Sequence, residues 1–391
     1  MLKPNAYDVF LLSAAFNAAQ LLTTFLFQRR LRRQLRQRPG DYAPSVTVIV
    51  ACKGDPPDLA ENMSSLLDQD YPGRREYLLA LPSRADPAHR RIETLLAGRG
   101  DVQVRLCASE ALPSCSSGKA LDLLFALRQA PPQTEILLFA DADIRVHRTW
   151  ISELVSPLQD ARVGAATSAL LAVPHQSGFW SFLRFVWLGL NVPYWSFTDS
   201  VCGQSLAMRR QDFHDLDVQR LWAGALLEDL ALAPRLRSWG RRTVFVASAM
   251  PRTTSDCQAG QFFDVFNRWI KCYRLFDPLV WLWGLLYLLV KTGITLWSIL
   301  HRDWLLLAFF WSLDMLNVFL LFSMYRRLLP DRFESLPPAF RSFPVLAALA
   351  SPLLTAIQLL HFLASVLDDR VAWGGYVYRV ARGKVVEVMR R

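Results

Sequence analysis

Long apolar segments bracket this chain, and they constrain its fold more than any other feature. Residues 9–27 carry no charge and are about one bilayer long at roughly 1.5 Å of rise per residue. Six Arg follow within residues 29–38. Positive charge after an apolar segment favours the cytoplasm, and the pattern lacks the small-residue cleavage site of a signal peptide. We therefore expect an uncleaved signal-anchor helix at 1–28, followed by a basic juxtamembrane linker at 29–43.

Three further apolar segments, at 279–299, 304–324 and 344–367, lie near the other end of the chain. Lys291 and Asp314 interrupt the first two, so we expect both side chains to face protein rather than lipid. Only a very short link separates these two segments, which predicts a helical hairpin. The membrane part of the chain is therefore expected at 279–367.

The basic tail, residues 368–391, conflicts with four full crossings. An odd number of crossings would leave it in the cytoplasm, where its Lys and Arg favour it, but four would place it outside. Two alternatives stay open: Pro352 breaks the last segment into a re-entrant hairpin, or the tail is an exception. We expect a multi-pass protein of a bacterial inner membrane, with the region between the apolar ends in the cytoplasm.

Composition excludes several classes of protein. With 391 residues, a formal charge of +10, 52% hydrophobic and 20% charged residues, the chain is too apolar to be disordered or collagenous. Its six Cys form no CxxC pair, so neither a zinc module nor a disulfide scaffold is indicated. The Arg run could suggest nucleic-acid binding, but it abuts a membrane anchor, where anionic headgroups satisfy it. We expect no nucleic-acid partner.

The middle of the chain, residues 44–278, has the composition of a complete α/β domain. Strand patterns at 45–51, 76–82, 102–107 and 135–140 alternate with helical ones, which predicts a mostly parallel sheet whose ligands bind beyond the carboxyl ends of the strands. Asp58 and Glu61 predict a capping box for the first of these helices. The Trp-rich segment 178–197 is interrupted by Arg and Pro, so we expect a helix lying in the membrane interface.

The fourth predicted strand runs into Asp141-Ala142-Asp143. Two carboxylates separated by one residue can hold a divalent metal, Mg2+ or Mn2+, which would neutralise a leaving diphosphate. An Asp after a strand is also a common turn or cap residue. The strand context favours the metal site. Lys119, in SSGKALDL, could add positive charge for a phosphate, or be a solvated residue in the first turn of a helix.

Glu228 and Asp229 lie inside the apolar stretch LLEDLAL. Buried carboxylates are costly unless they are paired or functional. An Asp here could act as a general base towards an acceptor hydroxyl. A carboxylate that caps a helix or pairs with Arg explains the pattern equally well, so the residues alone leave both interpretations open.

Taken in order, these motifs resemble the membrane-bound family 2 glycosyltransferases, and among them the ceramide glucosyltransferase-like branch that includes hopanoid glycosyltransferase-like proteins. The similar segments span nearly the whole chain: KGDPPDLAENMSSLLDQDYP (53–72), Asp-Pro-Ala (86–88), LLFADADIRV, CGQSLAMRR (202–210), LLEDLAL, VFNRW and the tail VAWGGYVYRVARGK (371–384). By itself, VFNRW reads as the aromatic and basic belt of a membrane helix. Within the resemblance it is similar to the closing (Gln/Arg)-x-x-Arg-Trp signature.

The resemblance implies a cytosolic, inverting enzyme with a Rossmann-like GT-A nucleotide-diphospho-sugar domain, which uses Mg2+ or Mn2+ and transfers a sugar, from UDP-hexose, to a hydroxyl of a membrane lipid. Asp229 would be the general base, and Asp141 and Asp143 the metal ligands. The implied nucleotide-sugar contacts are Lys53, Asp86, Lys119, Asp141 and Arg268, and the implied acceptor contacts are Gly203, Glu228 and Trp269.

Three departures from the family pattern bear on this assignment. Ser83 stands where the family has its first Asp, with Asp86 or Asp55 as possible substitutes, and Val265 takes the Gln/Arg position of the closing signature. Val192 replaces a His that ceramide glucosyltransferases carry. The alternatives are therefore a hopanoid or other lipid acceptor, a processive polysaccharide synthase, which usually has more membrane spans, and a non-catalytic membrane scaffold.

Overall fold

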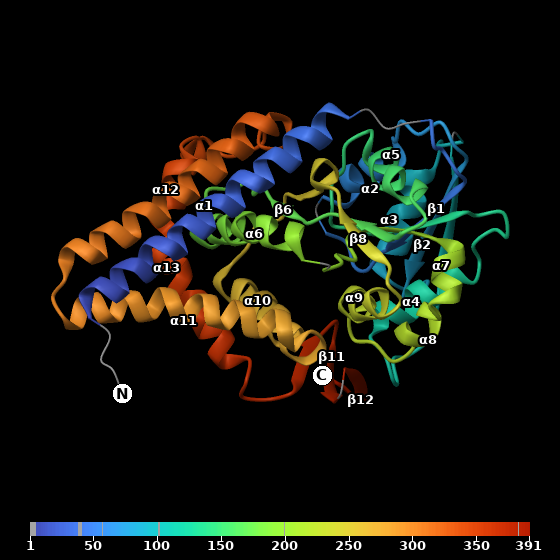
Figure 1. The fold of residues 1–391 in the computed structure, drawn as a ribbon. Helices are drawn as coiled ribbons and strands as arrows, with labels where there is room; N and C mark the ends of the chain where they lie inside the picture. The colour runs from blue at the N-terminus through green and yellow to red at the C-terminus, as the bar shows by residue number, and fades with distance from the viewer. Residues whose placement is uncertain (1–4, 38–40, 57, 101, 199, 382) are drawn as a thin grey trace.

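The computed structural model describes residues 5–37, 41–56, 58–100, 102–198, 200–381 and 383–391. A sheet-containing domain occupies one half of the molecule, and long apolar helices form the other half (Figure 1). Helix α1, from the N-terminal end of the chain, runs alongside α12, from its C-terminal part, in both views.

The central sheet has seven strands in the order β3-β2-β1-β4-β7-β5-β8. The first four in this order are parallel, and only β7 runs against its neighbours. This confirms the predicted, mostly parallel sheet. The strands are β1 (Val46–Ala51), β2 (Arg75–Leu81), β3 (Gln103–Ala108), β4 (Ile136–Asp141), β5 (Val163–Thr167), β7 (Ser205–Arg209) and β8 (Arg242–Phe245).

Helices and apolar cores cover both faces of the sheet. Val48 and Val50 of β1 belong to one core and Ile49 to the other, because successive side chains of a strand point to opposite faces. The helices of the domain are α2 (Leu59–Leu67), α3 (Pro87–Leu96), α4 (Gly118–Leu127), α5 (Trp150–Val155), α7 (Arg210–Asp215), α8 (Val218–Trp222) and α9 (Glu228–Ser238). The short elements are the 3-10 helices Ser156–Gln159, Ala247–Ala249, Pro330–Arg332 and Pro338–Phe340, and the two-stranded sheet of β6 (Leu171–Ala172) and β9 (Arg252–Thr253).

The capping box predicted for α2 is wrong. The Asp58 carboxylate accepts a hydrogen bond from Thr254 Oγ1 at 2.8 Å instead of capping its own helix. The carboxylate that would cap the helix is thus hydrogen-bonded to a residue 196 positions away in the chain.

Helix α1 (Ala6–Arg36) continues through most of the predicted linker. Arg30 donates to the carbonyl oxygens of Ser196 and Phe245, and Gln34 also donates to that of Phe245. The basic end of α1 is therefore docked on the sheet-containing domain. Residues 38–40 of the predicted linker lie outside the described residues.

Among the described residues, four helices are long and apolar enough to cross a membrane: α1, α11 (Pro278–Leu300), α12 (Trp304–Leu328) and α13 (Phe343–Ala364). They match the four segments expected from the sequence. Pro352 lies inside α13, which continues on both sides of it. Of the two alternatives left open for the last segment, a break at Pro352 is therefore wrong.

Two more helices join the apolar half to the sheet: α6 (Phe179–Phe197) and α10 (Ala259–Phe276). Helix α6 covers the predicted interfacial segment, but most of its side chains are buried. Phe185 packs edge to face on both Phe322 of α12 and Phe343 of α13. Helix α6 therefore packs between the two halves of the molecule, and its place at a membrane interface stays a prediction.

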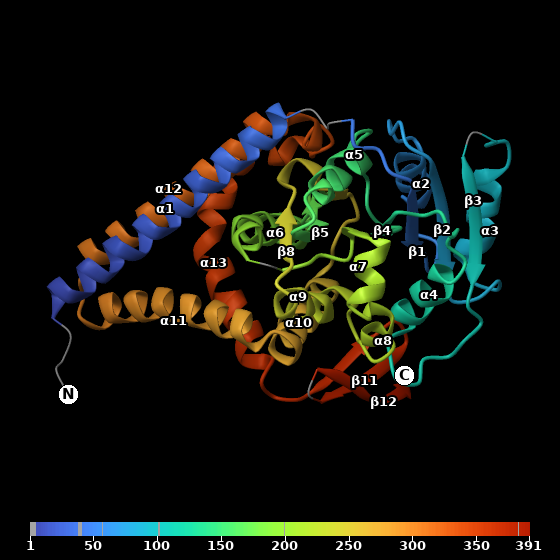
Figure 2. The same ribbon diagram turned by 45° about the vertical axis from the view of Figure 1, so that its right-hand side comes forward.

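Both ends of α13 lie against the sheet-containing half (Figure 2). Just before α13, Arg332 contacts His147. Just after it, Asp368 pairs with Lys271 of α10 at 2.5 Å. The far ends of α11 and α12 are joined at residues 301–303, away from the sheet. A bilayer crossed by the α11–α12 hairpin would therefore have both ends of α13 on one side.

The tail after α13 folds into a three-stranded antiparallel sheet of β10 (Arg370–Trp373), β11 (Tyr376–Ala381) and β12 (Lys384–Arg390). Lys53 Nζ donates to the Gly374 carbonyl at 2.8 Å, in a turn where Gly374 and Gly375 both have positive φ. The Val385 N–H donates to the Gly224 carbonyl at 3.1 Å. The tail is thus part of the sheet-containing domain, and not a separate basic extension.

Candidate active site

The two Asp of the DAD motif lie at the carboxyl end of β4. Asp141 is the last residue of the strand and pairs in register with Ala51, the last residue of β1. The Oδ1 atom of Asp141 lies 2.6 Å from Lys119 Nζ. The Asp143 side chain is exposed, but the surrounding protein reduces the solvation of its carboxylate. This desolvation, together with the charge of Asp141, raises the pKa of Asp143.

Lys119 joins two acidic groups from different parts of the chain. It lies in the first turn of α4, after the N-cap Ser117, whose Oγ accepts from the Ala120 N–H at 3.1 Å. Its Nζ is 2.6 Å from Asp141 Oδ1 and 2.7 Å from Glu228 Oε1. Burial by itself would lower the pKa of Lys119, but the two carboxylates outweigh it and raise the pKa. Lys119 is therefore a charged group at the centre of the site.

Glu228 and Asp229 begin helix α9, so neither is a mid-helix surface carboxylate. Asp229 Oδ2 accepts from the Gly203 N–H at 2.9 Å, and Oδ1 accepts from the Leu230 N–H at 2.7 Å. Burial and the charge of Glu228 raise the pKa of Asp229 to about 6, although the two backbone hydrogen bonds and Lys119 oppose the shift. Asp229 is thus ionised at neutral pH and more basic than an ordinary Asp.

Gly203 is required by the close approach of α9. A Cβ at this position would lie 2.5 Å from Glu228 Oε1 and 3.5 Å from the Cβ of Asp229. The absence of a side chain lets the Gly203 backbone reach the Asp229 carboxylate. The structure therefore brings together five predicted residues in one contact network: Gly203, Asp141, Lys119, Glu228 and Asp229.

A second group lies at the ends of β1 to β3. Asp86 Oδ1 accepts from the N–H of Gly54 at 2.8 Å and from that of Ala88 at 2.9 Å, so it caps α3 and holds the loop that carries Lys53. Asp122 of α4 is buried and accepts from Ser109 Oγ. Burial raises the pKa of Asp122 to about 6, while this hydrogen bond and the charge of Lys53 oppose the shift.

Arg268 and Trp269 are adjacent on α10 but face different cavities. The Arg268 guanidinium lies over the Trp373 ring at 5.5 Å and lines a cavity of about 480 Å3 between α10 and the C-terminal sheet. No carboxylate among the described residues lies within ion-pair distance of Arg268, and burial lowers its pKa. The Trp269 ring lines the cavity described next.

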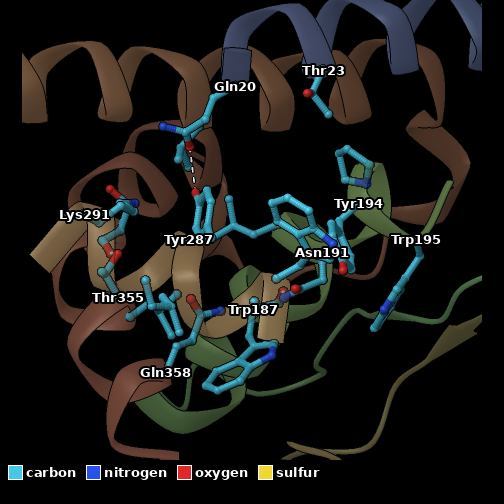
Figure 3. Close-up of a pocket in the computed structure, with 18 of the residues that line it drawn as sticks. Gln20, Thr23, Trp187, Asn191, Tyr194, Trp195, Tyr287, Lys291, Thr355 and Gln358 are labelled. Atoms are coloured by element: carbon cyan, nitrogen blue, oxygen red, sulfur yellow. Dashed lines mark hydrogen bonds between the residues drawn. The ribbon is translucent and has the colours of Figure 1, made fainter. Parts of the chain in front are cut away.

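An aromatic cavity of about 350 Å3 lies among α1, α6, α10, α11, α12 and α13 (Figure 3). Its rings come from opposite sides, with Trp187 and Trp195 on α6 and Tyr287 on α11. Four of its six helices are those long enough to span a membrane. The cavity therefore lies mainly between the apolar helices.

Tyr273 connects this cavity with the carboxylate cluster. It lines the cavity and also packs against the apolar cluster that contains Leu226 and Leu230, on either side of Glu228 and Asp229. Burial raises the pKa of Tyr273. Cys202 precedes Gly203 in the chain, and its own pKa is raised by burial and by Asp229. Tyr273 is thus shared between the cavity and the apolar cluster at the start of α9, the helix that carries Asp229.

The DAD carboxylates have the chemistry of a divalent metal site, although the described residues contain no group of three or more His, Cys, Asp and Glu placed to hold an ion. Mg2+ and Mn2+ prefer oxygen ligands, and Mg2+ is commonly bound by one or two carboxylates with substrate phosphates and water. Burial and the charge of Asp141 raise the pKa of Asp143, and a cation held by the two carboxylates would offset both effects. The donor set therefore fits either ion.

Sequence reasoning missed Asp122, Tyr273 and the C-terminal sheet. Asp122 had a usable signal, because it interrupts the apolar run of α4 as Glu228 and Asp229 interrupt theirs. Tyr273 and the tail had none, since their contacts join segments far apart in the chain.

Residues 9–386 match the glycosyl transferase family 21, which is nearly the whole chain. The chain belongs to glycosyl transferase family 21. An N-acetylglucosaminyltransferase of Bradyrhizobium elkanii is 28% identical over an alignment of 168 residues, which covers 41% of this chain and 86% of that protein. This family 21 protein is therefore a glycosyltransferase, as the motif resemblance implied, and the ceramide glucosyltransferase-like branch stays a prediction.

Two solved structures are similar to this family 21 chain. The mannosyltransferase PcManGT from Pyrobaculum calidifontis, in complex with GDP-Man and Mn2+, is 18% identical with a TM-score of 0.49, covering 92% of this chain and 98% of that one. The glucosyl-3-phosphoglycerate synthase from Mycobacterium tuberculosis, in complex with Mn2+, UDP and phosphoglyceric acid, is 15% identical with a TM-score of 0.41, covering 60% and 82%.

Proposed function

We propose that this family 21 glycosyltransferase passes a hexose from a UDP-sugar to a hydroxyl of a membrane lipid, with inversion. Ceramide-type and hopanoid-type lipids are the first two acceptor candidates. One observation carries the proposal: the aromatic cavity among the apolar helices reaches Tyr273, which also packs against the apolar cluster that contains Leu230, the residue after Asp229. An acceptor anchored in the apolar half can thus present its polar end to the carboxylate cluster.

Asp229 is the proposed general base. Its carboxylate is held by the N–H groups of Gly203 and Leu230, and its pKa of about 6 suits a base that works near neutral pH. The acceptor oxygen bonds to the anomeric carbon as the bond from that carbon to the diphosphate breaks. The hydroxyl proton passes to Asp229, and attack opposite the leaving group inverts the configuration.

The proposed donor site lies across the carboxyl ends of β1 and β4. Asp141 and Asp143 would hold Mg2+ or Mn2+, and such a cation, when bound, offsets the negative charge of the departing diphosphate. Lys119 supplies positive charge next to Asp141. Lys53 and the loop held by Asp86 face the same edge of the sheet, and Arg268 lines the neighbouring cavity under the C-terminal sheet.

Glu228, Gly203 and Trp269 are proposed to serve the acceptor side. Glu228 holds Lys119 in place, and Gly203 allows the close approach of α9 on which the position of Asp229 depends. Trp269 lines the cavity through which the acceptor would reach Asp229. We further propose that the domain faces the cytoplasm of a bacterial cell at the inner membrane, where nucleotide-sugars are made.

The test is transfer of radiolabelled sugar from a panel of UDP-sugars into total lipid extract, with membranes that contain the chain, with and without EDTA. We expect a labelled lipid that disappears with EDTA and in the Asp229→Asn variant. Label in a polymer instead would indicate a processive synthase. No transfer from any donor, together with no binding of UDP in the presence of Mn2+, would favour a non-catalytic scaffold.

A further inference from the structure

The aromatic cavity contains a polar cluster far from the carboxylates of the active site. Lys291 of α11 pairs with Asp314 of α12 at 2.8 Å, and Ser351 of α13 donates to the other Asp314 oxygen at 3.0 Å. All three residues line the cavity. A buried ion pair within membrane-spanning helices is costly and is commonly tied to function.

The cluster is part of a longer polar lining. In Figure 3, Gln20 of α1 and Tyr287 of α11 are joined by a hydrogen bond, which is 2.7 Å long. Lys291 lies further along α11, and Thr355 and Gln358 lie on α13. The further polar side chains that line the cavity are Thr23, Thr24, Asn191 and Asn317. A cavity built only for hydrocarbon needs none of these groups.

One donor in this lining lacks a partner. The Oε1 atom of Gln20 accepts from Tyr287, but its buried Nε2 has no hydrogen-bond partner among the described residues. Lys291 uses one donor for Asp314 and turns towards the rings of Tyr287 and Trp311, at 5.6 and 5.0 Å. Unsatisfied donors in an apolar surrounding cost free energy, so an occupant that brings an acceptor is favoured over one that does not.

The cluster lies well away from the sheet-containing half. Val280, near the start of α11, and Lys291 both line the cavity, so the lining extends roughly 16 Å along this helix at the usual rise. An acceptor whose reactive hydroxyl lies at Asp229 would therefore place a more distant part of the same molecule against Lys291, Asp314 and Gln20.

We infer that the cavity selects lipids that carry a hydrogen-bonding group on the part of the molecule lying between the helices, as distinct from lipids whose embedded part is plain hydrocarbon. This inference rests on the proposed lipid-acceptor function and narrows its substrate class. Lys291, Asp314 and Gln20 are the residues that recognise the embedded polar group. The ion pair also links α11 to α12, so the test must separate recognition from packing.

The probes are a long-chain alcohol and a set of long-chain diols whose second hydroxyl is placed at increasing distance along the chain. Each is also prepared with a bromine atom, which quenches fluorescence of the Trp residues around the cavity. Binding to the full chain in lipid nanodiscs is then read from quenching, and sugar transfer is measured separately. Loss of transfer alone therefore concerns the proposed function, and loss of selective binding concerns this inference.

The first variant combines Lys291→Met with Asp314→Leu. It removes the ion pair without leaving an unpaired charge buried. The second, Gln20→Leu, keeps the ion pair and removes the donor that has no partner, so the inference can be tested even if the first variant misfolds. Ser298→Ala is the matched control, because Ser298 is a buried polar residue of α11 that donates to the Ile294 carbonyl and lies outside the cavity lining.

We expect the wild-type chain to bind one diol about tenfold more tightly than the alcohol, the size of effect that a hydrogen bond to a charged group gives. The first variant should lose this preference, the second should weaken it, and Ser298→Ala and Asp229→Asn should keep it. Equal binding of alcohol and diols by the wild type would mean that the polar lining holds only water, and would overturn the inference. A preference that survives in both lining variants would overturn it as well.

Discussion

Lys119 Nζ lies 2.7 Å from Glu228 Oε1, although the two residues are more than a hundred positions apart in the chain. Because the same Nζ contacts Asp141 at 2.6 Å, one ammonium group links the end of β4 to the start of α9. Asp229 follows Glu228 directly. The position of the proposed base relative to the proposed metal ligands therefore depends on Lys119.

Replacing Lys119→Met should lower stability by about 3 kcal/mol, because two partly or fully buried carboxylates lose their common partner. It should also raise the pKa of Asp229, which the charge of Lys119 holds down. The measurements are the thermal midpoint and the pH profile of transfer. Lys53→Met is the matched control, since Lys53 is exposed and donates only to the Gly374 carbonyl; an equal loss of stability in both variants would contradict the prediction.

The rate of transfer should fall as the pH is lowered through about 6, by about tenfold for each pH unit below that value. The reason is that the base must be ionised, and the pKa of Asp229 is raised to about 6. The measurement is kcat/KM against pH. Asp122→Asn serves as the control, because burial also raises the pKa of Asp122 to about 6. If the transfer rate of that variant no longer falls below pH 6, Asp122 and not Asp229 is the titrating group.

Asp143→Ala should abolish the gain in UDP affinity that Mn2+ or Mg2+ provides. Without Asp143 the ion would depend on Asp141, whose Oδ1 is already paired with Lys119 at 2.6 Å, so the remaining oxygen ligands would hold it too weakly. Calorimetric titration of UDP with and without EDTA measures the effect, with Asp215→Ala as an exposed carboxylate control. Equal UDP affinity with and without EDTA in the wild type would show that the DAD motif is not a metal site.

Gly203→Ala should reduce transfer by on the order of a hundredfold. The added Cβ would meet Glu228 Oε1 at 2.5 Å and displace the start of α9, and a base moved by a fraction of an ångström loses much of its effect. Gly224→Ala is the matched control, since a Cβ there meets no atom within 4 Å among the described residues. Near-normal transfer by Gly203→Ala would show that α9 can adjust without loss of the base.

A reporter that is active only in the cytoplasm should be active when fused after Arg391 and silent when fused before Met1. The tail contacts the sheet-containing domain through Lys53 and Gly374, so both must lie on one side of a membrane. The docked end of α1 lies on that side too, and its other end points away. A silent reporter on an expressed C-terminal fusion would contradict this arrangement.

The sequence by itself determined the apolar helices, the parallel strands and the order of the candidate motifs. These features depend on local pattern: apolar runs of the right length, alternation of strand and helix, and carboxylates within apolar stretches. For this reason Asp141, Glu228 and Asp229 could be found without a structure. The capping box at Asp58 failed because a distant Thr254 took the carboxylate, which no local pattern records.

The tertiary structure alone decided how these parts meet. Lys119, Asp141 and Glu228 come together because α4, β4 and α9 converge at one edge of the sheet. The tail returns to the domain because both ends of α13 pack against it, although its apolar pattern is that of an ordinary membrane span. Contacts between distant segments depend on the packing of whole elements, and this is why the polar cluster at Lys291 and the cavity it lines could be located only in the folded chain.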